Sequence, residues 1–252
     1  MAVQEKYPRT LAQDIVYPDS DGKPMADNTL QALWIIILYD NLRGLLAGQD
    51  VLIAADLFWY PVEGDPYTKV APDVLVALGR PDGYRGSYKQ WKEDNQPPQV
   101  VFEVLSPSNS AMEMLSKLDF YERYGVSEFV LIDPEKNEFI AYQAEKGKLI
   151  RTAKVGETWK SPLLGIQFVE EEGKLQVRNP DGTPFKTFAE LKAEKEALKA
   201  EKEILMTEKE VLKVEKEALK AEKDESEAAR DAALLEVERF KARLRELGED
   251  LE

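Results

Sequence analysis

Apolar residues between positions 29 and 47 recur at the three- and four-residue spacing of a helix. Such spacing gathers them on one face, as in an amphipathic helix that packs on a core. The turn-rich stretch "DSDGKPMADN" comes just before, and Asp27 or Asn28 has a side chain that can cap the first turn. The pattern predicts a helix from about Thr29 to Ala47, with the apolar positions Leu30, Leu33, Trp34, Ile37, Leu38, Leu42 and Leu45.

Short apolar runs of strand length follow this helix, namely "QDVLIAADLFWYP", "PDVLVALG" and "QVVFEVLS". A second helical pattern runs from Ala111 to Tyr124, and Gly125 is placed as its C-terminal cap. "SEFVLIDP" is typical of another buried strand, and "NEFIAYQAEKGKLIRTA" of a hairpin with Lys-Gly at its turn, before a smaller β-rich stretch. Several strands ahead of a crossover helix favour a mixed sheet over a doubly wound parallel one. We predict an α/β domain over residues 1–187.

From Phe188 onward leucine recurs every seven residues, as at the d position of a heptad repeat. A helix of about 60 residues would be roughly 90 Å long. Lysines fill the middle a positions and weaken such a seam, so a solvated helix held by pairs such as Lys192–Glu196 is the alternative. We predict that residues 188–252 form a coiled coil and join two copies of the chain in a homodimer. The leucines are Leu191, Leu198, Leu205, Leu212 and Leu219.

The composition removes several kinds of chemistry. The 252 residues include no cysteine and no histidine, which excludes disulfides, thiolate nucleophiles, Ser-His-Asp triads and the usual zinc centres. Any metal site must use mainly oxygen ligands, which suits Mg²⁺ or Mn²⁺. The net charge of −14 repels nucleic acid at long range, so DNA binding would need bound cations or a local basic patch.

No segment is typical of export or of membrane insertion. The opening "MAVQEKYPRT" lacks the apolar region of a signal peptide, and the most apolar run, "ALWIIILY", is too short to span a bilayer. We expect a cytoplasmic protein without a membrane segment.

Glu103 is the first candidate for chemistry because it interrupts the apolar strand "VVFEVL". Side chains alternate along a strand, so Glu103 shares a face with Val101, whereas Phe102 and Val104 point the other way. Desolvation of a carboxylate is unfavourable unless a cation or a cleft compensates it. Asp73 begins a neighbouring strand, and two acids at one sheet edge form a site for a divalent ion.

A cationic group should stand beside such a site to stabilise negative charge on a reacting phosphate. Lys117, on the helix that follows the Glu103 strand, is the candidate, and Glu113 is expected to position it. Each member of the site also has a structural interpretation. Asp73 could end a turn, Glu103 could be a buried partner of Lys117 without an ion, and Lys117 could be an ordinary helix lysine.

A basic and aromatic loop, "GRPDGYRGSYKQWK", lies between the strands of Asp73 and Glu103. Basic residues mixed with aromatic ones can bind phosphates and stack on bases. We expect Arg80, Arg85 and Lys89 to contact nucleic acid near the site, although the loop could simply be solvated and docked by its aromatic residues.

The ordered set "APDVLV", "VVFEVLSPSN", Lys117 and "YERYGVSEFVLIDP" resembles the Uma-type restriction-endonuclease family of the PD-(D/E)XK nuclease superfamily. The similarity covers about residues 10–187. It implies a restriction-endonuclease-like core, with Asp73 and Glu103 as metal ligands and the Val104 carbonyl as a further one. The superfamily pattern has lysine two residues after the glutamate, where this chain has Leu105. The resemblance implies that Lys117 takes over that role.

These observations support two functions of different kinds. The first is a Mg²⁺- or Mn²⁺-dependent endonuclease that hydrolyses DNA phosphodiester bonds, with Asp73, Glu103 and Lys117 as its catalytic residues. The alternative is a catalytically inactive nuclease fold that acts as a scaffold through its coiled coil. A hydrolase of some other phosphate substrate is a third, lesser alternative.

Overall fold

The computed structural model describes residues 15–20, 22 and 24–246. It divides into two units, residues 1–187 and residues 188–252. The opening stretch, expected to hold no signal peptide, lies outside the described residues. The first unit contains α1 (Thr29–Leu45), β1 (Val51–Ala55), β2 (Trp59–Tyr60), β3 (Val74–Leu78), β4 (Tyr88–Lys89), a 3-10 turn (Gln90–Lys92), β5 (Val100–Val104), α2 (Ala111–Tyr124), β6 (Glu128–Asp133), β7 (Glu138–Glu145), β8 (Lys148–Ala153), β9 (Trp159–Lys160), β10 (Gln167–Glu171) and β11 (Lys174–Arg178).

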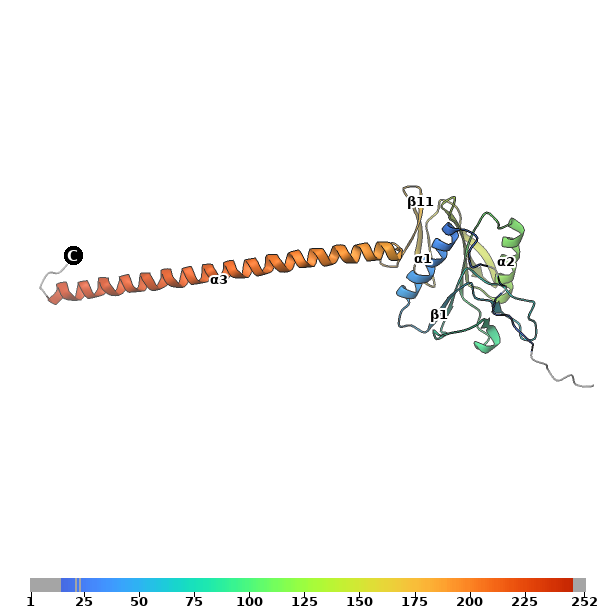
Figure 1. The fold of residues 1–252 in the computed structure, drawn as a ribbon, viewed down its shortest axis with the longest axis horizontal. Helices are drawn as coiled ribbons and strands as arrows, with labels where there is room; N and C mark the ends of the chain where they lie inside the picture. The colour runs from blue at the N-terminus through green and yellow to red at the C-terminus, as the bar shows by residue number, and fades with distance from the viewer. Residues whose placement is uncertain (1–14, 21, 23, 247–252) are drawn as a thin grey trace, which may run out of the picture. The chain divides into compact units, whose positions relative to one another are not determined.

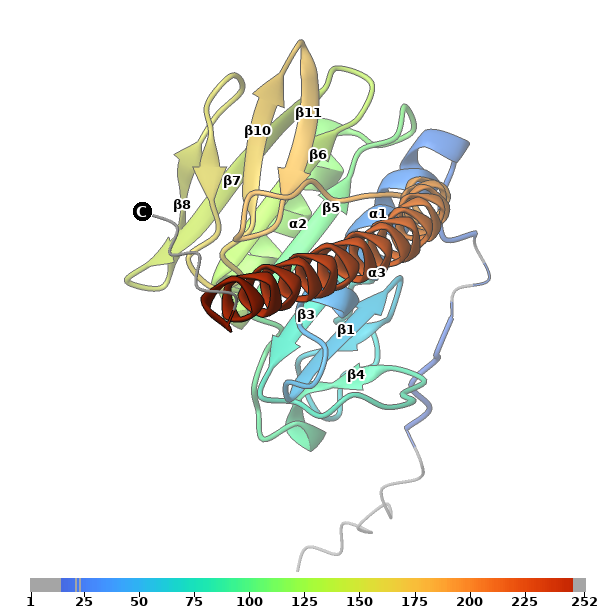
Figure 2. The same ribbon diagram turned by 90° about the vertical axis from the view of Figure 1, so that its left-hand side faces the viewer.

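A six-stranded mixed sheet forms the centre of the first unit, in the order β1-β3-β5-β6-β7-β8 (Figure 2). Only β5 and β6 run parallel within it, and every other neighbouring pair is antiparallel. A parallel pair needs a crossover connection, and α2 supplies it. The predicted mixed α/β sheet is therefore confirmed.

Two layers cover the two faces of this sheet (Figure 1). On one face α1 and the small β11-β10-β9 sheet bury a common core, in which Leu38 of α1 and Phe168 of β10 join Phe102 of β5. On the other face α2 packs through Tyr121 against Val101 and Phe129. Because successive residues of β5 point to opposite faces, Phe102 and Val101 belong to different cores.

The helix ends follow the expected capping chemistry. Asn28 caps α1 by accepting a hydrogen bond from the Gln31 backbone N–H at 2.9 Å, which decides between the two candidates. The helix ends at Leu45, two residues earlier than predicted. Ser110 caps α2, and Gly125 ends it in the left-handed region at φ 91°. At the β7–β8 turn Lys146 and Gly147 both have positive φ, as a tight hairpin requires.

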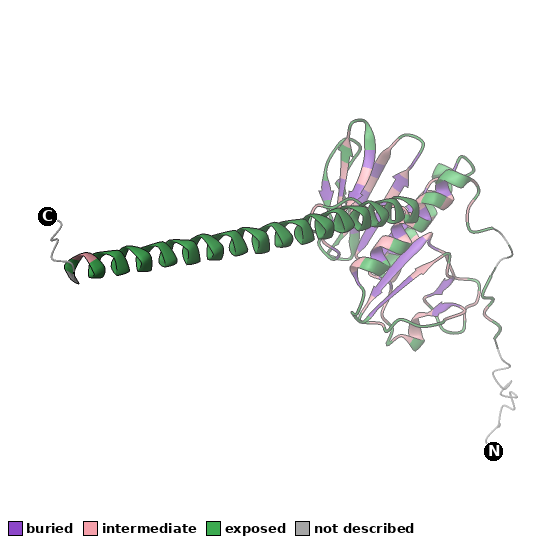
Figure 3. Cartoon of the chain, turned by 60° about the vertical axis from the view of Figure 1, so that its left-hand side comes forward, coloured by how far each residue is buried: buried purple, intermediate pink, exposed green. Residues whose placement is uncertain are grey.

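The described residues of the second unit form α3 (Phe188–Glu246), a continuous helix of 59 residues. Its described side chains are exposed along almost the whole length, as the green ribbon in Figure 3 shows. Between residues 15 and 246, none of the helices combines the length and the apolar character that a membrane crossing requires.

Candidate active site

The site is built where β3 begins and β5 ends. The two strands are antiparallel, and Val74 pairs with Phe102. One step further in this register, Asp73 comes opposite Glu103, and both side chains extend toward the sheet face that α2 covers. The predicted alternation along β5 is confirmed, because Phe102 and Val104 lie in the opposite core. The two acids therefore meet on one face of the sheet.

Glu103 is buried, with 2% of its side chain exposed, and two groups of α2 compensate it. Lys117 Nζ donates a hydrogen bond to Glu103 Oε2 at 2.8 Å. The hydroxyl of Tyr121 donates to Glu103 Oε1. Burial, and then the charge of Glu103, hold the pKa of Tyr121 well above its usual value, so this phenol stays a donor. The carboxylate inside an apolar strand is thus matched by one ammonium and one phenol.

Asp73 is the carboxyl group whose protonation this arrangement changes most. Its Oδ2 accepts a hydrogen bond from the Val104 backbone N–H at 2.6 Å. Burial and the nearby charge of Glu103 raise the pKa of Asp73 to about 8, although the Val104 N–H and Lys117 oppose the shift. Two neighbouring acids with one lysine leave a surplus of negative charge, which Asp73 relieves by holding a proton. A bound divalent cation would remove the need for that proton.

Lys117 comes from the middle of α2, and 20% of its side chain is exposed. Burial lowers the pKa of Lys117, but the charges of Glu103 and Asp73 outweigh it and raise the pKa above its usual value. The charge of Glu113, which was expected to position this lysine, also raises the pKa of Lys117, while its carboxylate accepts from Asn109 Nδ2 at 3.3 and 3.4 Å. The ion-pair partner is Glu103 instead, because the strand end lies directly under the helix.

The carbonyl of Val104 belongs to the same corner. It accepts a hydrogen bond from Nε2 of Gln31 at 2.8 Å, and Gln31 is buried in the first turn of α1. Oε1 of Gln31 in turn accepts from the Asp27 backbone N–H at 2.8 Å. A carbonyl oxygen has two lone pairs, so one remains for a further partner. The start of α1 is thereby fixed to the end of β5.

An open cleft of about 540 Å³ lies over this corner. Acidic side chains dominate its charged lining, and Asp56 is one of them. The second cation in the lining is Lys69, whose ammonium lies 4.5 Å from the centroid of the Phe58 ring. The charged and polar lining residues are Asp27, Gln31, Asp56, Lys69, Asp73, Ser108, Asn109, Glu113 and Lys117.

The donor set suits a hard divalent cation with an incomplete protein shell. Asp73 and Glu103 offer two carboxylates, and Val104 offers a carbonyl. Mg²⁺ is commonly held by one or two carboxylates, with water and phosphate oxygens completing the shell. Among the described residues, no group of three or more acidic side chains is arranged to hold a metal ion. The open cleft leaves room for these remaining ligands.

The basic loop between β3 and β5 does not line the cleft. It leaves β3 at Leu78, the end remote from Asp73, and the cleft lining comes from residues 24–31, 56–73 and 108–117. Arg80 pairs with Asp94 at 2.5 Å and Arg85 with Glu93 at 2.7 Å. Two acids just beyond the quoted stretch therefore offset much of its positive charge.

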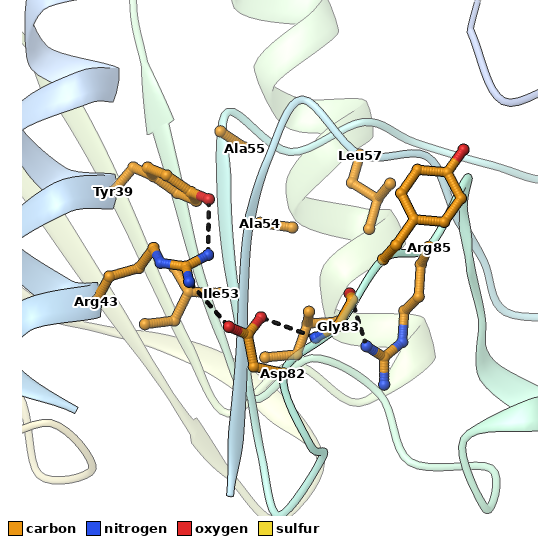
Figure 4. Close-up of a pocket in the computed structure, with 11 residues that line it drawn as sticks. Tyr39, Arg43, Ile53, Ala54, Ala55, Leu57, Asp82, Gly83 and Arg85 are labelled. Carbon is orange, nitrogen blue, oxygen red and sulfur yellow. Dashed lines mark hydrogen bonds and ion pairs between the residues drawn. The ribbon is translucent and has the colours of Figure 1, made fainter. Parts of the chain in front are cut away.

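Lys89 and Arg85 belong to separate surroundings. Lys89 lies on β4 beside β2, and its ammonium is 5.1 Å from the centroid of the Tyr17 ring. Arg85 instead lines a second pocket of about 590 Å³, where Arg43 bonds to Tyr39 and Asp82 (Figure 4). None of residues 79–92 lines the cleft over Asp73, because β3 carries the chain away from that end of the sheet.

Three residues at or near the site were not predicted from the sequence. Gln31 and Tyr121 follow the spacing of helix faces and resemble core positions. Lys69 stands four residues before Asp73 in "TKVAPD", and only the fold of residues 56–73 brings it into the cleft. Each reaches the site through tertiary contacts between distant segments.

The structure thus combines a mixed sheet, two acids on adjacent antiparallel strands and a lysine on the crossover helix beside them. The sequence pattern of one family, Uma2, described as "Putative restriction endonuclease", matches residues 13–177, which is more than half of the chain. The chain belongs to this family, as the resemblance of its motifs implied.

The fold is similar to the crystal structure of "a putative nuclease belonging to DUF820" from Anabaena variabilis, with a TM-score of 0.43 and 14% sequence identity. The likeness covers 55% of this chain and 75% of that one. The search of curated proteins gave no match.

Proposed function

We propose that the chain is an endonuclease that hydrolyses DNA phosphodiester bonds with Mg²⁺ or Mn²⁺ bound at Asp73 and Glu103. The observation that carries the proposal is the meeting of these two acids on adjacent strands, beside Lys117 and under an open cleft. Membership of a family described as restriction endonucleases supports DNA as the substrate. We propose that the reaction takes place in the cytoplasm.

Asp73, Glu103 and the carbonyl of Val104 would hold the cation. When bound, such an ion makes water a stronger nucleophile and neutralises charge on the phosphodiester. Asp73 must lose its proton to bind, because its pKa is raised to about 8 by burial and by Glu103. The hydrogen bond from the Val104 N–H fixes one Asp73 oxygen, Oδ2.

Lys117 is the group that stabilises the additional negative charge as a nucleophile adds to phosphorus. Its ammonium is fixed by Glu103 and reaches the cleft. Lys69 would bind a neighbouring phosphate of the DNA backbone, because its ammonium lines the same cleft above aromatic rings. Of the three loop residues, Lys89 is the best placed to extend this contact, whereas Arg80 and Arg85 would first have to leave Asp94 and Glu93.

Supercoiled plasmid tests this proposal directly. We expect nicked or linear product with Mg²⁺ or Mn²⁺, and none with EDTA. Glu103→Gln and Asp73→Asn should each lower the rate roughly a hundredfold, since each removes a charged ligand of the cation. Glu145→Gln is the matched control, because Glu145 is exposed at the end of β7. Equal cleavage by Glu103→Gln and the control would contradict the assignment.

A second function is favoured by one observation. Both carboxylate oxygens of Glu103 already accept hydrogen bonds from the protein, as in a purely structural ion pair. The protein would then be a nuclease-fold scaffold that binds partners through its long helix. Titration calorimetry with Mn²⁺ separates the two functions. The endonuclease should bind Mn²⁺ at a site that Asp73→Asn weakens, whereas a scaffold shows equal heats for both proteins.

A further inference from the structure

The apolar stripe of α3, formed by five leucines at d, is exposed among the residues that the structure describes. The five leucines at d, from Leu191 to Leu219, are each between 48% and 66% exposed. A repeat of seven residues keeps this stripe facing one side of the helix over many turns. Exposed leucine at such regular spacing is typical of a surface that a second helix covers.

The residues on the two sides of this stripe carry opposite charges, with one exception at e. In the heptads that place Leu191 at d, position e is lysine in four cases out of five and position g is glutamate in all five. The e residues are Lys192, Lys199, Met206, Lys213 and Lys220, and the g residues are Glu194, Glu201, Glu208, Glu215 and Glu222. Residues at e and g flank the seam and meet the partner helix.

This pattern distinguishes the two possible directions of a partner. In a parallel pair, g of one helix meets e of the other five residues later, so Glu194 faces Lys199 of the second helix. Glu208 likewise faces Lys213, and Glu215 faces Lys220. In an antiparallel pair centred on this stretch, g meets g and e meets e, which brings glutamate against glutamate and lysine against lysine.

From this charge pattern we infer that α3 pairs with α3 of a second copy, in parallel and in register, as a two-stranded coiled coil. The inference goes beyond the proposed function and does not depend on nuclease activity. Charge complementarity selects a second copy, because a single chain carries both halves of every attractive pair. Within one helix, Lys199 lies 3.2 Å from Glu196, but both are 59% exposed, so this weak pair can exchange for an interhelical one.

The lysines at a favour two strands over three or four. They are Lys195, Lys202, Lys209, Lys216 and Lys223. At a two-stranded seam a lysine stem can lie along the interface while its ammonium reaches water, which a larger bundle prevents. In the parallel pair, the lysine at a also lies beside the partner's glutamate at g, as for Lys202 and Glu201. These contacts offset the cost of a polar seam.

A parallel pair has a consequence for the first units. Each is joined to its α3 at Phe188, so both are attached at the same end of the coil. An antiparallel pair would hold them about 90 Å apart, given the rise of roughly 1.5 Å per residue.

Single cysteines test the direction, because the chain has none of its own. We expect the full-length Leu198→Cys protein to form a disulfide-linked dimer under mild oxidation, since position 198 faces itself only in a parallel pair. Ala200→Cys is the matched control, because Ala200 lies at f on the outside of the seam. Failure of Leu198→Cys to cross-link more than Ala200→Cys would overturn the parallel arrangement.

Charge exchange tests the pairing rule. One variant carries Glu194, Glu208 and Glu215 changed to lysine, and the other carries Lys199, Lys213 and Lys220 changed to glutamate. Each variant alone should self-associate about tenfold more weakly or worse, and an equimolar mixture should regain the affinity of the parent. Sedimentation of the full chain gives these affinities. A monomeric parent, or variants that associate as the parent does, would overturn the inference, and neither result decides whether the chain is an endonuclease.

Discussion

The ion pair of Glu103 and Lys117 is an unusual feature for the interior of a sheet. A buried charge is tolerated when a partner and additional hydrogen bonds satisfy it. Glu103 has both, because Lys117 donates to one oxygen and Tyr121 to the other. The same contacts hold the carboxylate beside Asp73, so one set of interactions serves stability and the proposed site together.

Loss of the lysine should therefore be felt in stability. Lys117→Met leaves Glu103 buried without a counter-charge, and we expect the free energy of unfolding to fall by about 3 kcal/mol. Urea denaturation at pH 7 measures it. Lys148→Met removes a lysine whose side chain is 70% exposed in its pair with Glu122, and it should leave the urea midpoint nearly unchanged. Similar midpoints for both variants would show that Glu103 is not charged in the folded protein.

Asp73 makes the stability depend on pH in an uncommon direction. Its pKa rises from 3.8 to about 8 on folding, through burial first and then the charge of Glu103. The folded protein thus holds a proton that the unfolded chain has lost, and stability contributed by this proton decreases as the pH rises from about 4 to 8.

The metal-free protein tests this sign. In EDTA, the urea midpoint of Asp73→Asn should fall less between pH 5 and pH 8 than the midpoint of the parent. Asparagine has no proton to lose in this pH range, whereas the raised pKa of Asp73 lies at its upper end. With Mn²⁺ added, the parent should gain more stability at pH 8 than at pH 6, whereas Asp73→Asn should gain little at either pH. Parallel pH profiles in EDTA would contradict the raised pKa.

At the scale of elements, two glycines of the helices should respond to alanine substitution with stability changes of opposite sign. Gly125 ends α2 at φ 91°, where a side chain is strained, so Gly125→Ala should lower the free energy of unfolding by about 1 kcal/mol. Gly44 lies inside α1, without a positive φ, and a Cβ there meets open space. Gly44→Ala should raise it by about 0.5–1 kcal/mol. Thermal unfolding of both variants checks the signs, and equal shifts would contradict this view of the two glycines.

Local patterns were sufficient for most elements of the first unit. The bounds of α2, its glycine cap and the Lys146–Gly147 hairpin all follow from contacts within a few residues, which a sequence displays directly. The two faces of β5 followed from alternation alone. The mixed sheet was predictable because a crossover helix after several strands permits few other arrangements.

Contacts between distant segments were not predictable in the same way. The register that brings Asp73 opposite Glu103 depends on how the 20-odd residues between β3 and β5 fold, and nothing local fixes it. For the same reason Gln31 was missed as the partner of Val104, 73 residues away. The positive charge of the basic loop was overestimated, because Glu93 and Asp94, which pair with its arginines, follow just after it.

The whole molecule joins two units of contrasting character. Residues 1–187 bury a core on both faces of a sheet, whereas the described side chains of α3 are almost all exposed. Helices in proteins gain most of their stability from the packing of an apolar face. The parallel coil inferred above would supply a partner for that face and would also bring two candidate active sites to one end of a single assembly.

Such an assembly should change the products of DNA cleavage. If each site cuts one strand, a dimer cuts both strands in one encounter, because the second site is already held near the same DNA. The parent should then convert supercoiled plasmid to linear product early. The variant with Glu194, Glu208 and Glu215 changed to lysine should accumulate nicked circles first, and an equimolar mixture with the Lys199, Lys213 and Lys220 glutamate variant should restore early linear product.

The order in which nicked circles and linear DNA appear shows whether the dimer cuts both strands in one encounter. Mn²⁺ binding by calorimetry should be equal for the parent and the lysine variant, since the candidate ligands Asp73 and Glu103 both belong to the first unit. A monomeric variant that still produces linear DNA as early as the parent would show that one unit cuts both strands. The dimer would then act in targeting or affinity, and paired cutting would not be its role.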